Sequence, residues 1–212
     1  ADAFISGLTR NYPLALKPAM EVIGSIASSG RVAGMHIILT KSGPLFFADT
    51  TVNIDHTWQE LVELTLLVNE QVKKYQIEPR IALVSYSNFG SSRGAGPEKI
   101  QKAVDYLHKH HPEIIVDGEM QVSYALDGEN RAKTAPFSTL GEAQANVLIF
   151  PNLESGNIAY QLMRSVGPME AIGPVLLGFD KAVHILHHTS SVREIANMAA
   201  IAVVDAQGKQ QS

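Results

Sequence analysis

The stretch IALVSYSNFGSSRG, residues 81–94, joins an apolar run to a loop of small polar residues. Residues 81–86 are apolar almost throughout, which is typical of a strand covered on both faces, as in a parallel sheet. The polar loop leads into a helix with Pro97 in its first turn, where proline is tolerated. The stretch therefore predicts a strand–loop–helix unit of an α/β protein.

The same alternation of extended and helical segments runs along the chain. Reciprocal capping motifs, TWQE at 57–60 and SVRE at 191–194, predict the starts of two helices. The similar TLGE at 139–142 predicts a short helix, and the charged segment 127–134 predicts a turn. Further helices are expected from about residues 97, 120 and 155, and strands at 35–40, 45–50, 81–86, 114–116, 147–150, 175–178 and 183–186. The predicted fold class is α/β with a mostly parallel sheet.

The composition of the 212 residues is that of a packed soluble domain, with 45% hydrophobic and 18% charged residues. A net charge of −4 without a basic block argues against nucleic acid as a partner. No apolar run approaches the roughly 20 residues of a membrane helix, and the first residues do not resemble a signal peptide. The absence of cysteine excludes disulfides and thiolate sites. These features favour a cytoplasmic protein that binds no membrane.

Ligands of open α/β sheets collect beyond the carboxyl ends of the strands. Four polar segments are expected there: 87–94, 117–119, 152–157 and 184–194. None of them matches the phosphate loop or the dinucleotide fingerprint, so the sequence does not support nucleotide binding through those motifs.

The strongest candidate for anion binding is the turn formed by Ser155, Gly156 and Asn157. We expect Ser155 to cap the helix and Gly156 to let a ligand approach the backbone, because a helix N-terminus attracts negative charge. An ordinary capped turn without a ligand explains the same residues, and this alternative stays open. A weaker candidate of the same kind is the loop that contains Asn88, Ser91 and Ser92.

Titratable side chains allow two other interpretations. Asp117 and Glu119 could form an acid–base pair or a magnesium site, although such residues more often cap helices or tie loops together. The segment AVHILHHTSSVRE at 182–194 contains three histidines with a spacing compatible with a zinc pair. A zinc site needs a third ligand, and the nearest carboxylate, Glu194, is explained by helix capping. No metal site is therefore predicted.

Several segments, in order along almost the whole chain, resemble phosphate acetyltransferases (phosphotransacetylases). They include IEPRIALVSYSNFGSS at 77–92, DGEMQ at 117–121, ANVLIFPNLESGNIAYQL at 145–162 and GPVLLGFDKAVHIL at 173–186. Three segments are most similar to the phosphotransacetylase-like C-terminal domain of large bacterial NADP-dependent malic enzymes: SNFGSS at 87–92, DGEMQ at 117–121 and NMAAIAVVDAQ at 197–207.

This resemblance implies a three-layer α/β sandwich of the isocitrate/isopropylmalate dehydrogenase-like type, in two lobes with a ligand cleft between them. Residues 1–212 would form one phosphotransacetylase-like domain that lacks an N-terminal portion. Its lobes would be 25–172 and 1–24 plus 173–212. The resemblance also implies a homodimer or a higher oligomer.

The resemblance also assigns site residues. In phosphotransacetylases the segment that corresponds to 186–191 reads LSRGCS, and its Ser and Arg help to hold the acyl phosphate. These two positions are His187 and His188 here, and the Asp that is proposed to deprotonate the CoA thiol corresponds to Glu194. A family arginine corresponds to Lys17. Histidine lacks the charged fork of arginine, so the pattern favours a binding site over a catalytic one.

The function implied is that of a regulatory domain that binds acetyl-CoA, a related acyl-CoA or an acyl phosphate. It would act on a covalently linked malic-enzyme portion that converts malate to pyruvate and CO2. NADP and a divalent metal would belong to that portion, and the domain itself would need no cofactor. Two alternatives stay open: an active phosphate acetyltransferase, and an oligomerisation scaffold with a vestigial cleft.

Overall fold

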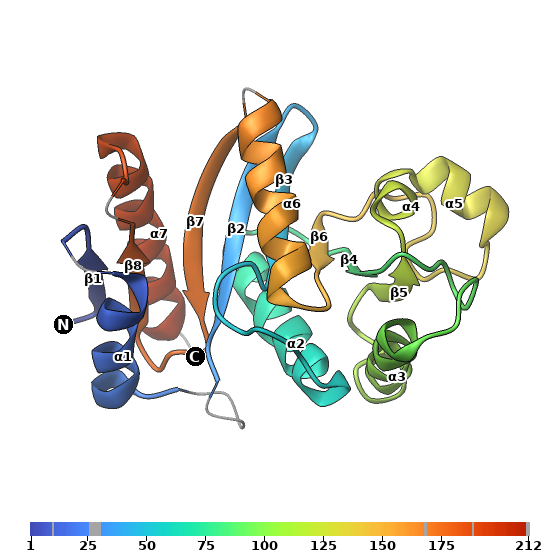
Figure 1. Cartoon of the computed structure of the whole chain (residues 1–212), viewed down its shortest axis with the longest axis horizontal. Coiled ribbons are helices and arrows are strands. Elements are labelled where there is room, and N and C mark those ends of the chain that lie inside the picture. Colours follow the sequence, from blue (N-terminus) through green and yellow to red (C-terminus); the bar gives the residue numbers. More distant parts are fainter. Residues whose placement is uncertain (10, 26–30, 168, 188, 211–212) are drawn as a thin grey trace.

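The computed structural model describes residues 1–9, 11–25, 31–167, 169–187 and 189–210 (Figure 1). The strands are β1 Ala3–Gly7, β2 Ala33–Thr40, β3 Gly43–Ala48, β4 Ile81–Val84, β5 Val116–Met120, β6 Val147–Ile149, β7 Glu170–Leu177 and β8 Ala182–Leu186. The helices are α1 Tyr12–Ile23, α2 Trp58–Lys74, α3 Ala95–His110, α4 Val122–Leu126, α5 Gly128–Thr134, α6 Leu153–Val166 and α7 Val192–Gln210. Among these described residues, no helix is both long and apolar enough to cross a membrane.

Six of the strands form one sheet in the order β5-β4-β6-β3-β2-β7. The four strands from β5 to β3 are parallel, whereas β2 runs antiparallel to both β3 and β7. The remaining two strands, β1 and β8, form a separate parallel pair. The predicted α/β class with a mostly parallel sheet is confirmed.

The strand β4, which lies between β5 and β6, is buried on both faces of the large sheet. Ile81 and Leu83 pack into the cluster that contains α2 and α3, and Ala82 and Val84 pack into the cluster that contains α4 and α6. Two helical layers thus cover the sheet, which gives three layers. An apolar run without polar alternation is what this double burial requires.

A smaller layer, made of β1, β8, α1 and α7, lies beside the β7 edge of the large sheet (Figure 1). Its own core combines helix residues Ala15, Leu16 and Ala19 with Val183 and Ile185 of β8. The lobe boundary expected between residues 172 and 173 falls inside β7, a strand of the large sheet. No pattern in the sequence predicted β1 or α1.

Three local predictions in the middle of the chain are wrong. The segment 117–119 belongs to β5 and does not follow it, and 127–134 contains helix α5, whose start Asp127 caps. TLGE at 139–142 forms turns and no helix. The reason is that Thr139 bonds to β5: its hydroxyl donates to the Val116 carbonyl at 2.7 Å, and its N–H donates to Asp117 Oδ2 at 2.9 Å.

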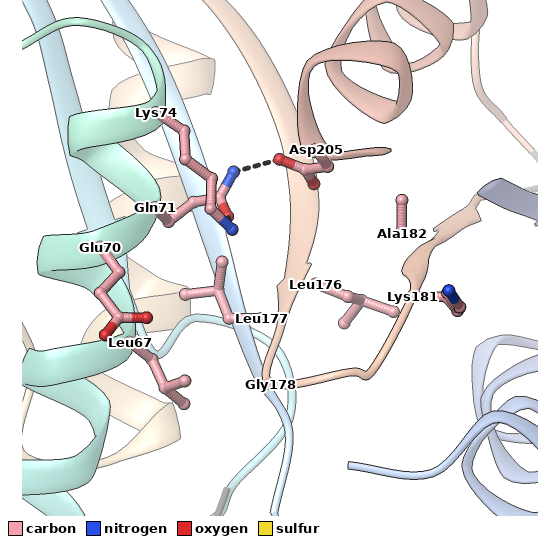
Figure 2. Close-up of a pocket in the computed structure, with 10 residues that line it drawn as sticks. All are labelled: Leu67, Glu70, Gln71, Lys74, Leu176, Leu177, Gly178, Lys181, Ala182 and Asp205. Atoms are coloured by element: carbon pink, nitrogen blue, oxygen red, sulfur yellow. Dashed lines mark hydrogen bonds between the residues drawn. The ribbon is translucent and has the colours of Figure 1, made fainter. Parts of the chain in front are cut away.

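A buried polar network joins helix α2, which covers the large sheet, to β8 and α7 of the smaller layer. Asp205 of α7 lies with Oδ2 3.0 Å from His184 Nε2 of β8, and its Oδ1 accepts a hydrogen bond from Gln71 Nε2 of α2. Figure 2 shows Gln71 and Asp205 pointing toward each other across a crevice of about 20 Å³. A space of this size holds about one water molecule, so the crevice is a joint between helices and no ligand site.

The network gives a first prediction, on stability. Asp205→Ala should lower the free energy of unfolding by about 3 kcal/mol, because it leaves His184 and Gln71 buried without their shared partner. Urea denaturation of the variant and the parent chain measures the difference. Asp105→Ala, on the exposed side of α3, is the control and should change stability by less than about 0.5 kcal/mol. Equal effects of the two substitutions would contradict a structural role for the network.

Candidate functional site

A cleft of about 510 Å³ opens where the first turn of α7, the start of β7 and the last turn of α6 meet. We call it the Arg164–Glu194 cleft. Its lining residues are Arg164, Met169, Glu170, Ala171, Thr189, Ser191, Arg193 and Glu194. The structure therefore brings part of the predicted segment 184–194 to a concave site.

Glu194 uses both carboxylate oxygens within the protein. Its Oε2 accepts a hydrogen bond from the Ser191 N–H at 2.6 Å, while its own N–H donates to Ser191 Oγ at 3.2 Å. This reciprocal pair confirms the capping box predicted at the start of α7. The other oxygen, Oε1, lies 3.5 Å from Arg164 Nη2.

Two arginines supply positive charge to the cleft, and sequence reasoning missed both. Arg164 comes from α6, and Arg193 from the first turn of α7, where its Nη2 lies 2.6 Å from Glu170 Oε2. Glu170 Oε1 also accepts a hydrogen bond from Asn197 Nδ2 at 3.0 Å. Each guanidinium is thus held by a carboxylate across the cleft, and these pairs link α6, β7 and α7.

A buried histidine lies behind Arg164. Arg164 Nη1 donates to Tyr160 Oη at 3.3 Å, and the Tyr160 ring stacks on His36 with 3.7 Å between ring centroids. His36 Nδ1 lies 2.7 Å from Thr50 Oγ1. Burial, and then the charge of Arg164, lower the pKa of His36 to about 3. The imidazole is therefore neutral at neutral pH, and the cation next to the cleft is Arg164.

The turn before α7 is closed by its own hydrogen bonds. The His187 N–H donates to Ser190 Oγ at 3.1 Å, and His187 Nδ1 lies 2.8 Å from Thr189 Oγ1. His188, expected beside it, lies outside the described residues. Lys17 is on α1 with its side chain largely in solvent, 3.9 Å from Glu21 Oε1.

The loop with Asn88, Ser91 and Ser92 is organised around a carboxylate of the protein itself. Glu119, fully buried in β5, accepts hydrogen bonds through Oε1 from Ser87 Oγ and from the Gly90 N–H, both at 2.7 Å. Ser92 N donates to Ser87 Oγ, Ser91 Oγ accepts from Asn88 N, and Asn88 Oδ1 accepts from Gln121 N. The donors that the sequence offered to a ligand anion bind Glu119 and one another.

The Ser155–Asn157 turn has a similar explanation. Asn152, and not Ser155, is the N-cap of α6, and its side chain accepts a hydrogen bond from the Ser155 N–H at 2.9 Å. A Cβ on Gly156 would lie 2.6 Å from the Asp49 carbonyl oxygen, so close packing on the end of β3 requires this glycine. Asn157 Nδ2 donates to the Thr50 carbonyl at 3.2 Å. The contacts are those of a capped turn tied to a neighbouring loop.

The acidic residues at 117–119 anchor loops as well, since Asp117 accepts hydrogen bonds from the N–H groups of Gly118 and Thr139. Within the described part of the chain, no group of three or more His, Asp or Glu side chains is arranged to hold a metal ion.

A second prediction concerns pH. The folded chain keeps His36 neutral down to about pH 3, whereas an unfolded histidine takes up a proton near pH 6.5. Between these values the unfolded state binds more protons, so stability falls as the pH falls, by about 1.4 kcal/mol per pH unit for one such group. Urea unfolding between about pH 6 and pH 4 should therefore show a shallower slope for His36→Gln than for the parent chain.

The control is His110→Gln, on the exposed side of α3, which should leave that slope unchanged. Burial also lowers the pKa of His56, so some acid sensitivity should remain in the His36 variant. Identical slopes for the parent chain and His36→Gln would refute the argument.

Comparisons with known proteins identify the family of the chain. The phosphate acetyl/butaryl transferase family matches residues 1–203. The NADP-dependent malic enzyme of Escherichia coli is 40% identical over 208 residues, which are 98% of this chain and 27% of that protein. The phosphate acetyltransferase of Clostridium acetobutylicum is 34% identical over 213 residues, which cover 97% of this chain and 64% of that protein.

A solved phosphotransacetylase from Streptococcus pyogenes superposes with a TM-score of 0.91 at 34% identity, over 98% of this chain and 63% of that one. The chain thus spans about a quarter of the Escherichia coli malic enzyme and just under two thirds of the Clostridium acetobutylicum phosphate acetyltransferase. Fold, sequence and extent of the match lead to one conclusion: the chain belongs to the phosphate acetyl/butaryl transferase family, whose domain occurs in both malic enzymes and phosphate acetyltransferases.

Proposed function

We propose that the chain is a regulatory domain that binds acetyl-CoA or an acyl phosphate in the Arg164–Glu194 cleft and does not transfer the acyl group. The observation that carries the proposal is the state of Glu194. This residue stands where the family has its proposed thiol base, yet its carboxylate caps α7 and faces Arg164.

Arg164 and Arg193 are suited to binding the phosphate groups. A guanidinium presents a planar fork of N–H donors that matches phosphate oxygens. Each fork faces a carboxylate in the structure, Glu194 or Glu170. A bound phosphate would compete with these carboxylates, so ligand binding would loosen contacts that tie α7 to α6 and β7.

Thiol deprotonation is disfavoured at the same site. The two carboxylate oxygens of Glu194 already face the Ser191 N–H and the Arg164 guanidinium, so a CoA thiol would have to displace one of these partners to reach them. The family's Ser and Arg are also replaced, at His187 and His188. The site therefore lacks the arginine charge that would stabilise the transition state of acyl transfer in the family.

The regulatory part of the proposal follows from the relatives. Malic enzymes of this type are much longer than the matched segment, so a linked portion would carry malate oxidation with its NADP and metal. Acetyl-CoA would act on that portion by binding one conformation of the domain more tightly than another. The protein would work in the cytoplasm as a homodimer or a larger oligomer.

One observation favours the alternative of an active phosphate acetyltransferase. The cleft gathers two arginines and two carboxylates, which are the kinds of group that acyl transfer to phosphate needs. The two functions differ in turnover, so a direct assay separates them.

A third prediction states the result of that assay. Calorimetry should detect binding of acetyl phosphate or acetyl-CoA, and incubation of acetyl phosphate with CoA should produce no thioester above the uncatalysed rate. Arg164→Met and Arg193→Met should each weaken binding about tenfold, since each removes a charged hydrogen bond. Arg93→Met, an exposed arginine of the loop after β4, should bind as the parent chain does.

Thioester formation that disappears in Glu194→Gln would establish the acetyltransferase instead. Absence of binding to either ligand would favour the oligomerisation scaffold.

A fourth prediction uses the family pattern. Combining His187→Ser, His188→Arg and Thr189→Gly should increase the affinity for inorganic phosphate, because it restores the family's arginine directly before residue 189, which lines the cleft. Calorimetric titration with phosphate measures the change. Unchanged affinity would mean that the turn at 187–190 does not face the phosphate.

A further inference from the structure

After two neighbouring strands of the large sheet, β4 and β6, the chain continues toward opposite edges of the sheet. From β4 the chain continues through α3, on one face, to the outer strand β5. From the adjacent β6 it continues through α6, on the other face, to β7. Between two such strands the connections diverge and leave a crevice at the carboxyl ends, where α/β proteins commonly bind ligands.

A pocket of about 770 Å³ occupies this crevice. We call it the switch-point pocket. Its lining residues are Asp55, His56, Thr57, Val84, Ser85, Tyr86, Ala95, Gly96, Lys99, Ile100, Val122, Phe150, Pro151, Asn152 and Ser155. The volume lies within the range of about 300–1,000 Å³ that small-molecule sites occupy.

The pocket shares no residue with the Arg164–Glu194 cleft. Ser155 and Arg164, which belong to one site each, are nine residues apart on α6. At 1.5 Å per residue this is about 14 Å along the helix axis. The two sites therefore lie at opposite ends of α6.

Apolar side chains line much of the pocket. Val84 is the last residue of β4 and Phe150 directly follows β6, while Ile100 comes from α3 and Val122 from α4. This lining favours a ligand with an aromatic or branched apolar body, because burial of such a body removes apolar surface from water.

Two groups suit a negative charge on that ligand, beside the Asp55 carboxylate, which is paired with Lys99. Among the described residues, no side chain caps α3, so the N–H groups of Ala95 and Gly96 are at an uncapped helix N-terminus that lines the pocket. Lys99, one turn further, donates to Asp55 Oδ1 at 2.7 Å and to the Pro151 carbonyl at 3.2 Å. An ammonium has three donors, so Lys99 has one more to give.

His56 provides an independent sign of a missing partner. The residue is only 4% exposed and lines the pocket, and its buried Nε2 has no hydrogen-bond partner among the described residues. Buried polar atoms of this kind are rare in folded proteins, because an unmade hydrogen bond costs about 1–3 kcal/mol. Burial lowers the pKa of His56, so a neutral imidazole can donate or accept one hydrogen bond.

We infer that the switch-point pocket binds a small organic anion, with an apolar ring or branched chain in the pocket and a carboxylate, sulfonate or phosphate at the α3 N-terminus and Lys99. The site is separate from the one that the proposed function uses. A failure of either proposal therefore leaves the other standing.

Two fluorescent probes test the inference: anilinonaphthalene sulfonate, an aromatic anion, and phenylnaphthylamine, a similar aromatic without charge. We expect each to bind the chain at one saturable site. Lys99→Met should lower the affinity for the anionic probe about tenfold and leave the affinity for the neutral probe unchanged, since only the anionic probe loses a charged contact. Lys102→Met, on the exposed side of the same helix, is the matched control and should bind both probes as the parent chain does.

Gly96→Leu tests the location. A Cβ at Gly96 would meet no atom within 4 Å, so the leucine can extend into the pocket without a clash, and both probes should lose their saturable binding. Thermal unfolding confirms that the variant is folded. Saturable binding that survives in folded Gly96→Leu, equal losses in the Lys99 and Lys102 variants, or no saturable binding to the parent chain would each overturn the inference.

Discussion

The buried carboxylate of Glu119 accepts hydrogen bonds from Ser87 and from the backbone of Gly90, and the loop after β4 takes its shape from these bonds. The loop after β3 is built in the same way around Asp49, whose oxygens accept the N–H groups of Gly34, Thr51, Val52 and Asn53. A buried carboxylate needs hydrogen-bond donors to replace the water it has lost. This constraint places donors of the strand-end loops on the protein's own carboxylates.

The constraint explains why loops that resemble anion-binding sites in the sequence do not offer their donors to a ligand. Small polar residues after a strand are what an internal carboxylate needs, and they are also what a phosphate needs. A loop that binds an internal carboxylate cannot be distinguished in the sequence from a loop that binds a phosphate, because the sequence does not show where the carboxylate lies. Positive charge available to ligands comes instead from side chains on helices: Arg164 and Arg193 at one end of α6, and Lys99 near the other.

The sequence was informative where the signal is local or periodic. The unbroken apolar run of β4 predicted burial on both faces, and the capping boxes at Thr57 and Ser191 form as expected. It misled where a residue bonds to a distant strand: Thr139 resembles a helix cap but bonds to β5. It placed the cap of α6 at Ser155, three residues after Asn152, because both residue types are good caps.

By itself, the sequence determined the α/β class, the mostly parallel sheet and membership of the family, because these depend on residue patterns that recur along the chain. Only the tertiary structure decided which polar residues face a cleft. Glu194 and Arg164 are thirty residues apart in sequence and meet only because α7 packs against β7, which brings its first turn to the end of α6. The switch-point pocket likewise exists because β4 and β6 are neighbours in space although β5 lies between them in the chain, and strand order is a property of long-range packing.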